Sequence, residues 1–277
     1  KINLKQNQRL AVLKPALTAH IQLNFKFIMS FLDIFLAADL ANFQPDDYVG
    51  FTFFTGYMAM FAASVFFLFE RGRVADEWKL SLLVSALITG IAAVHYYYMR
   101  DFYMSTGETP VVLRYIDWTL TVPLMCVEFY LLTKKAGAKI GLLWRLIYAS
   151  VAMLVLGYIG EAFYAGESTS WLFGAASGAA YFYIVWLVWK GEVAELAASA
   201  GGKVQRAVDY LAKFVIIGWA IYPIGYILGT EGGLFGMDLA EMVGYNGGVD
   251  IFYNIADAIN KIGFGLVVYA LAVSKED

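Results

Sequence analysis

Cysteine and charge are what this sequence has least of. The single cysteine, Cys126, cannot form an intrachain disulfide, and its position in an apolar run is typical of a packing residue. Charged residues make up 16% of the chain and the net charge is −3, which gives no indication of nucleic-acid binding. Hydrophobic residues make up 60%, aromatic residues 17%, and the mean hydropathy is +0.62. Such a composition is typical of a protein in a lipid bilayer.

Apolar runs recur along the chain, and a helical run of about twenty residues is long enough to cross about 30 Å of hydrocarbon. Seven spans are predicted, at roughly 48 to 69, 80 to 99, 111 to 132, 141 to 160, 170 to 189, 210 to 229 and 249 to 273. We therefore expect an all-α membrane domain within residues 46–277. We expect this domain to be a bundle of seven transmembrane helices, multi-pass in the cell membrane.

Residues 1–45 are the least informative part of the chain. They carry several basic residues and a short apolar patch, 27–40, that contains Asp33 and Asp39. This patch is too short and too charged to span a bilayer. A signal-peptide-like leader and an amphipathic surface helix are both open interpretations of this segment.

Basic residues gather in alternate loops between the spans. The first, third and fifth loops and the C-terminal tail carry them, whereas the other three loops together hold only Arg100. Because positive residues favour the cytoplasmic side, we expect the N-terminus outside and the C-terminus in the cytoplasm. The basic leader argues weakly for the opposite orientation.

The last span contains an acid and an amine, Asp257 and Lys261, where a membrane helix ordinarily carries neither. At this spacing on a helix, the two side chains share a face, one turn apart. An unpaired charge at mid-bilayer costs several kcal/mol, so the pair should face the bundle interior and marks a candidate functional site. A purely structural ion pair is the alternative.

The third span carries a polar track. Asp117, Thr121 and Glu128 stand at i, i+4 and i+11, which places them on one helix face. The rise from Asp117 to Glu128 is about 16 Å, with Asp117 toward the outside. We expect Glu128, in its apolar wall, to hold a proton, and Asp117, near Arg114 and Lys261, to be ionised. One carboxyl can then accept a proton and the other can give one.

The sixth span has an aromatic face next to a proline. Trp219, Tyr222 and Tyr226 share this face, and Pro223 removes a backbone hydrogen bond, so the helix can bend there. Plain packing is the usual meaning of such a face. With Trp118 of the third span opposite, it could instead wall a flat, apolar ligand.

Together these features resemble the microbial (type 1) rhodopsins, and among them the proteorhodopsins and their xanthorhodopsin relatives. The resemblance rests on the seven spans, the Asp257 and Lys261 pair, the run RYIDWTLTVPLMCVEFYLL and the run WAIYPIGY, and it covers roughly residues 46–273. It implies all-trans retinal bound to Lys261 as a protonated Schiff base, in a light-driven outward proton pump rather than an enzyme. It also implies a homo-oligomer, a pentamer or similar, in membrane lipid.

The resemblance implies a role for each residue that matches the family's motifs. Asp117 becomes the Schiff-base counterion and primary proton acceptor, Asp257 the second counterion, and Glu128 the cytoplasmic proton donor. Thr121 completes the Asp, Thr, Glu signature of outward proton pumps, and Arg114 matches the arginine on the extracellular side of the Schiff base. The residues that match the retinal cage are Trp118, Trp219, Tyr222 and Pro223.

Two further matches are less specific. His95 matches the histidine that hydrogen-bonds the acceptor aspartate in proteorhodopsins, although a membrane-helix histidine is more often a core or interface residue. Met125 falls where related pumps tune colour, and an apolar residue there resembles the green-absorbing type.

The fifth span is unusually rich in residues with small side chains from Trp171 to Tyr181. Close helix packing is the first explanation. Ser177 matches a serine near the retinal ring, and in that alignment Gly174 falls where xanthorhodopsin-type pumps have a glycine that opens a window to the ring. The resemblance therefore admits a hydroxylated carotenoid as a second pigment.

One device of the wider family has no counterpart. Bacteriorhodopsin has a pair of glutamates at its extracellular mouth that releases the proton. Here Val249 stands at the corresponding position twelve residues before the lysine. Asp250 is the next residue, and only this proximity suggests it as a substitute for the missing glutamate. The sequence does not identify the release group.

Proteins of other classes remain alternatives. A sensory photoreceptor with the same chromophore would not need a carboxyl at position 128. A sodium-pumping rhodopsin carries Asn and Gln where this chain has Asp117 and Glu128. A channel would need a continuous hydrated path, which Leu120, Leu124 and Val127 do not indicate. A transporter without retinal is left open by the ion pair alone.

Overall fold

A computed structural model describes residues 44, 46–229 and 248–274. The chain divides into two compact units, Lys1–Asp47 and Tyr48–Asp277, and every helix named below belongs to the second unit. The leader and surface-helix interpretations of residues 1–45 concern a segment outside the described residues, apart from residue 44.

Seven helices of the described residues are long and apolar enough to cross a membrane, as predicted. The first four are α2 (Tyr48–Glu70), α3 (Lys79–Thr106), α4 (Val111–Thr133, extended by a 3₁₀ turn at Lys134–Ala136) and α5 (Ile140–Phe163). The fifth comprises α6 (Ser168–Trp189) and α7 (Glu192–Ala200). The sixth comprises α8 (Gly202–Lys213), a π-helical turn (Phe214–Gly218) and α9 (Ile221–Gly229), and the last is α11 (Gly248–Val273).

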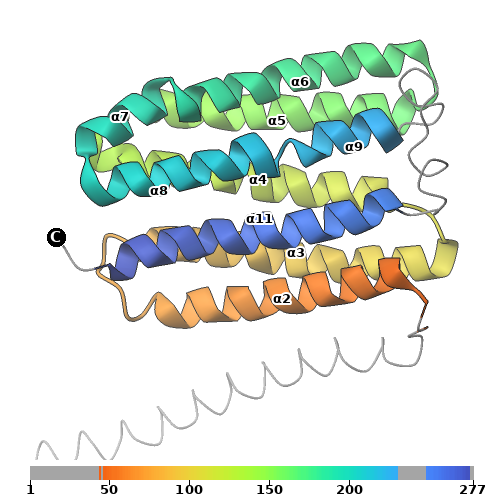
Figure 1. Ribbon diagram of the computed structural model, residues 1–277, viewed down its shortest axis with the longest axis horizontal. Helices are drawn as coiled ribbons and strands as arrows, with labels where there is room; N and C mark the ends of the chain where they lie inside the picture. Colours follow the sequence, from red (N-terminus) through yellow and green to blue (C-terminus); the bar gives the residue numbers. More distant parts are fainter. Residues whose placement is uncertain (1–43, 45, 230–247, 275–277) are drawn as a thin grey trace, which may run out of the picture. The chain divides into compact units, whose positions relative to one another are not determined.

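The helices pack in chain order, and α11 completes the bundle. Each of the helices α2 to α6 lies against the next, and α11 contacts α2 and α3 on one side and α8 and α9 on the other (Figure 1). Short connections between successive spans make neighbouring helices antiparallel. Asp257 and Lys261 are buried, so the face of α11 that carries them is directed into the bundle.

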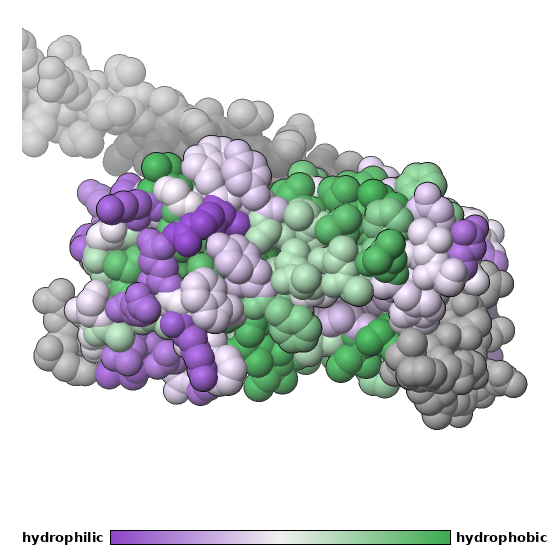
Figure 2. All heavy atoms as spheres, turned by 90° about the horizontal axis from the view of Figure 1, so that it is seen from above, coloured by the Kyte–Doolittle hydropathy of each residue, from purple (hydrophilic) through white to green (hydrophobic). Residues whose placement is uncertain are grey.

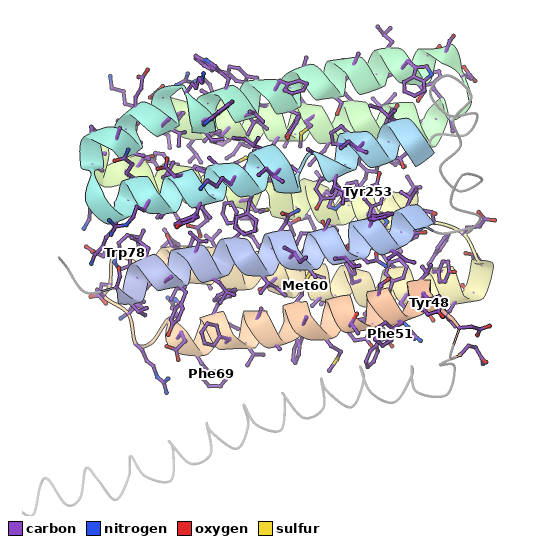
Figure 3. All side chains as sticks on the ribbon, in the orientation of Figure 1. Tyr48, Phe51, Met60, Phe69, Trp78 and Tyr253 are labelled. Carbon is purple, nitrogen blue, oxygen red and sulfur yellow. The ribbon has the colours of Figure 1, made fainter. Side chains whose placement is uncertain are left out.

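The outside of the bundle is apolar. Phe69 is 66% exposed and Phe182 67% exposed, and Figure 3 shows Phe51 and Phe69 pointing away from α2. In Figure 2, hydrophobic residues gather in the middle of the visible face and hydrophilic residues toward its ends. An exposed apolar belt of this kind is suited to lipid, as expected of a multi-pass membrane protein.

The interior contains several acidic and basic side chains. Those buried in the described ranges are the cations Arg100, Arg114 and Lys261 and the carboxyls Asp117, Glu128, Asp250 and Asp257. Three cations balance three carboxylates if one of the four carboxyls is neutral. Cys126 is buried in the hydrophobic core, in agreement with a packing role.

The sixth span is interrupted next to the lysine of α11. The sequence predicts a bend at Pro223, and the structure places the interruption just before it, at residues 219–220 between the π-helical turn and α9. Proline has no N–H to donate to the carbonyl four residues earlier, which favours a break at that point. Gly218 ends the π-helical turn, and its carbonyl accepts a 3.1 Å hydrogen bond from Asn260 Nδ2. A Cβ at Gly218 would overlap the Asn260 side chain, so only glycine permits this contact.

Candidate functional site

Lys261 lies between two carboxylates from different helices. Its Nζ is 2.6 Å from Asp117 Oδ2 on α4 and 3.0 Å from Asp257 Oδ2, one turn earlier on α11. All three side chains are buried. The structure therefore brings together the two polar features that the sequence places on separate spans.

The two carboxylates have unequal surroundings. Asp257 accepts hydrogen bonds from Tyr96 Oη at 2.7 Å and Trp118 Nε1 at 3.0 Å, and a further one from Tyr222 Oη. Asp117 Oδ1, by contrast, is buried and has no hydrogen-bond partner in the described part of the chain. Several donors stabilise a carboxylate anion. These donors favour the anionic form of Asp257, whereas one oxygen of Asp117 has no donor among the described residues.

His95 and Thr121 are neighbours of Asp117 without bonding to its carboxylate. His95 Nδ1 lies 3.7 Å from Asp117 Oδ1, beyond hydrogen-bond distance, and 2.9 Å from the carbonyl oxygen of Ile91. The predicted hydrogen bond from His95 to Asp117 is not formed in the structure, because the ring nitrogen nearest to Asp117 contacts its own helix backbone. Thr121 Oγ1 donates to the backbone carbonyl of Asp117 at 2.9 Å.

Glu128 forms no ion pair within the described part of the chain. Its side chain is buried on α4, and neither carboxyl oxygen has a hydrogen-bond partner among the residues described. The hydroxyl of Ser81 on α3 faces it without meeting hydrogen-bond geometry. Burying an unpaired carboxylate costs far more than burying the neutral acid. These surroundings favour a protonated Glu128, which makes it the neutral member of the four buried carboxyls.

Arg114 is paired toward the opposite end of α4 from Glu128. Its Nη2 donates to Asp250 Oδ1 at 2.6 Å and to Asn254 Oδ1 at 2.8 Å, and Thr109 Oγ1 donates to the second oxygen of Asp250 at 2.8 Å. Arg114 Nη1 is 3.5 Å from Tyr96 Oη, which in turn bonds the Lys261 site. The sequence places Arg114 near Asp117, but its carboxylate partner in the structure is Asp250.

A cavity of about 580 Å³ adjoins this charged site. Its walls are mainly apolar and aromatic, and they include the predicted residues Trp118, Gly174, Ser177, Trp219, Tyr222 and Pro223. The Trp118 ring packs edge-on against Tyr222 at 4.9 Å and Tyr253 at 5.6 Å, and Tyr253 projects from α11 toward the neighbouring helices in Figure 3. Met125 is buried in the core but does not line the cavity.

The cavity fits the chromophore that the resemblance implies. Its volume lies in the range of small-molecule sites, and flat aromatic walls suit a long apolar polyene. Trp118 and Tyr222 line the cavity and also donate to Asp257, so one end of the cavity adjoins the Lys261 amine. Ser177 lines the cavity and donates to the Met153 carbonyl at 2.7 Å.

Sequence reasoning missed several polar residues of the site. Asp250, Asn254, Asp257 and Lys261 follow one another at spacings of four, three and four residues, which is one face of a helix. This periodicity could have identified Asn254 and the role of Asp250. Tyr96 gave no signal, because it stands in a run of three tyrosines.

Comparisons with known proteins show the family of this chain. The chain belongs to the family of bacteriorhodopsin-like proteins, whose family model matches residues 47–275. It is 41% identical over 240 residues to a green-light absorbing proteorhodopsin from Gamma-proteobacterium EBAC31A08, with 86% of this chain and 92% of the relative covered.

Solved structures of microbial rhodopsins share the fold. Xanthorhodopsin, described as a light-driven ion pump with dual chromophore, is 27% identical with a TM-score of 0.69, covering 83% of this chain and 94% of that one. The light-driven proton pump rhodopsin of Coccomyxa subellipsoidea is 25% identical with a TM-score of 0.68, covering 81% and 97%.

Proposed function

We propose that this protein is a light-driven outward proton pump that holds all-trans retinal on Lys261 as a protonated Schiff base. The proposal rests on the position of the Lys261 amine between two carboxylates. Asp257 accepts further side-chain hydrogen bonds, whereas Asp117 Oδ1 has no hydrogen-bond partner in the described part of the chain. The family membership and the names of the relatives support it. A sensory photoreceptor would need no isolated carboxyl such as Glu128.

The chain's own residues account for the first proton transfer. Bound retinal would supply light absorption and a light-driven loss of proton affinity at the Lys261 nitrogen. Asp117 receives the proton because its Oδ2 lies 2.6 Å from Nζ and its Oδ1 is free. Asp257 stays ionised because three side chains donate to it. The proton therefore moves toward α4 and not along α11.

Glu128 provides the proton that replaces the one lost. It lies on the helix face of Asp117, about 16 Å further along α4, so a direct transfer to Lys261 is too long for one hydrogen bond. The interrupted sixth span beside Asn260 offers a place where the structure can open to water. Because basic loops lie at the Glu128 end, that end faces the cytoplasm and transport is outward.

Light-driven acidification tests the proposed function. Cells that express the protein with retinal, illuminated in unbuffered medium, should acidify it, and a protonophore should abolish the change. Outward transport works against about 2.3 kcal/mol per 100 mV of membrane potential. Alkalinisation, or acidification that persists with the protonophore, would contradict a primary outward pump.

The cavity also supports a second pigment. It is lined by residues of the lipid-facing surface, among them Phe182, which is 67% exposed, and Ile224, which is 52% exposed. A hydroxylated carotenoid lying along α6 and α9 would reach the cavity there. At Gly174 an added Cβ would stand 2.7 Å from the Tyr226 ring, so the missing side chain also serves close packing, whereas Gly178 has open space beside it.

Gly174→Trp should remove carotenoid-sensitised pumping. With a hydroxylated carotenoid added to the purified pigment in liposomes, the action spectrum of the parent should contain carotenoid bands. The indole would fill the wall of the cavity and block contact, so these bands should vanish in Gly174→Trp. Ala179→Trp is the matched control, because Ala179 is exposed on α6 and does not line the cavity. If the action spectrum of the parent contains no carotenoid bands, Gly174 has only a packing role.

His95→Asn should shift the pH at which the pigment changes colour. The 3.7 Å separation from Asp117 is short enough for the two groups to interact electrostatically inside the bundle. The visible absorption band, followed during a pH titration, reports the protonation of the carboxylate beside the chromophore. An unchanged midpoint would show that His95 is not coupled to Asp117.

A further inference from the structure

A half-buried carboxyl near the extracellular mouth has no part in the steps above. Glu161 lies in the last turn of α5, at the same end of the bundle as the first turns of α4 and α11. Tyr115 Oη, from α4, donates a 2.7 Å hydrogen bond to its Oε2. No other hydrogen bond to Glu161 is found within the described ranges. Its partial exposure gives it a route to water that the fully buried Asp117 lacks.

The charged and titratable groups around Glu161 come from three helices. Arg114 and Tyr115 on α4, Asp250 and Tyr253 on α11 and Tyr226 on α9 all interact with it electrostatically. Arg114 is the cation of this group, and its closest hydrogen bond goes to Asp250. Glu161 therefore has a hydrogen-bond donor but no cation of its own, and a carboxyl in that position favours its neutral form.

Two links join Glu161 to the Lys261 site. The Tyr115 ring packs edge-on against Trp118 at 5.1 Å, and Trp118 donates to Asp257. Arg114, adjacent to Tyr115 in the chain, reaches Tyr96, which also donates to Asp257. Two residues, Tyr115 and Trp118, therefore lie between Glu161 and Asp257 of the lysine site.

We propose that Glu161, hydrogen-bonded by Tyr115, is the group that releases the proton to the outside. This inference rests on the proposed function. When Asp117 takes the proton from the Lys261 nitrogen, both groups become neutral, so the net charge of the inner site is unchanged and Asp257 is left as its anion. The charge of Arg114 stabilises the carboxylate that forms when Glu161 gives its proton to external water. Glu161 later regains a proton from Asp117, so one proton leaves the protein in each cycle.

The timing of proton release tests this proposal. In the purified pigment, a pH-indicating dye would time release, and the visible absorbance change would time proton loss at Lys261. Glu161→Gln should delay release by roughly tenfold or more relative to the parent, because no group remains to hold the proton, while the absorbance change keeps the parent rate. Tyr115→Phe, which removes only the hydroxyl, should also shift release. Glu167→Gln, at an exposed position next to α6, is the matched control and should keep parent timing.

The outcomes separate the two levels of the proposal. A parent pigment that releases no proton in the light would contradict the proposed function. A parent that releases normally, with unchanged timing in Glu161→Gln, would overturn the role of Glu161 alone. Equal slowing of the absorbance change and of release would indicate a structural role and also overturn it. If Glu161→Gln forms no pigment, Tyr115→Phe decides, and unchanged release in that variant counts against the proposal.

Discussion

Lys261→Ala should yield a protein with no visible absorption band when it is expressed with retinal. Lys261 is the cation between Asp117 and Asp257, and its Nζ is the amine placed to form the covalent link. Removing it eliminates the attachment point, so the loss of the band should be complete. The absorption spectrum of the purified, retinal-supplemented protein measures this directly.

Loss of colour must be separated from loss of fold. Removing one partner of a buried ion pair costs about 3–5 kcal/mol, and Lys261→Ala leaves two carboxylates unpaired. Lys261→Arg keeps a cation at the site but offers no primary amine, and it should be colourless as well. Lys213→Ala changes an exposed lysine and should keep the parent band. A visible band that survives in Lys261→Ala would refute the assignment.

Glu128→Gln should slow the return of the proton to Lys261 by about a hundredfold, the scale expected for loss of a positioned proton donor. Glutamine has nearly the shape of the buried acid but carries no transferable proton. The proton must then come from bulk water, so recovery of the visible band should also become slower as the pH rises. Flash-induced absorbance changes over a range of pH provide the measurement.

Two further variants sharpen this prediction. Glu195→Gln changes an exposed carboxyl on α7, at the proposed cytoplasmic end, and should recover at the parent rate at every pH. Asp117→Asn should abolish transport altogether, because the acceptor is lost. If Glu128→Gln recovers as fast as the parent, Glu128 is not the donor.

The sequence is a good guide to features that depend on one helix alone. The apolar runs predicted all seven spans, because crossing a bilayer requires a minimum length of apolar residues. The spacing of Asp257 and Lys261 placed them on one face, and the structure pairs them at 3.0 Å. The bounds were less accurate, since the sixth span begins at Gly202 and α3 extends to Thr106.

Contacts between helices could not be derived in the same way. Arg114 could pair with any nearby carboxyl, and its choice of Asp250 depends on how α4 and α11 are aligned along their length. The separation of His95 from Asp117 depends on a side-chain conformation that the pattern of residues does not specify. Glu161 was overlooked because a single glutamate at the end of a span looks like an interface residue until Tyr115 is seen to bond it.

In the proposed pump, the unequal carboxylates would explain how one amine has two counterions and still transfers its proton in one direction. Three donors saturate Asp257, whereas Asp117 keeps one oxygen unbonded. If the hydrogen bonds were shared equally, neither carboxylate would be preferred. Both carboxylates lie within hydrogen-bonding distance of Nζ, so in the proposed pump the hydrogen-bonding partners would mainly set the direction of this step.

Infrared difference spectroscopy of the illuminated pigment tests this central claim most directly. Proton transfer from Lys261 to Asp117 should produce the C=O stretch of a newly protonated carboxylic acid, in step with the visible change. The band should be absent in Asp117→Asn and should persist in any Asp257→Asn pigment that forms. A band that survives in Asp117→Asn and disappears in Asp257→Asn would contradict the assignment of Asp117 as the proton acceptor.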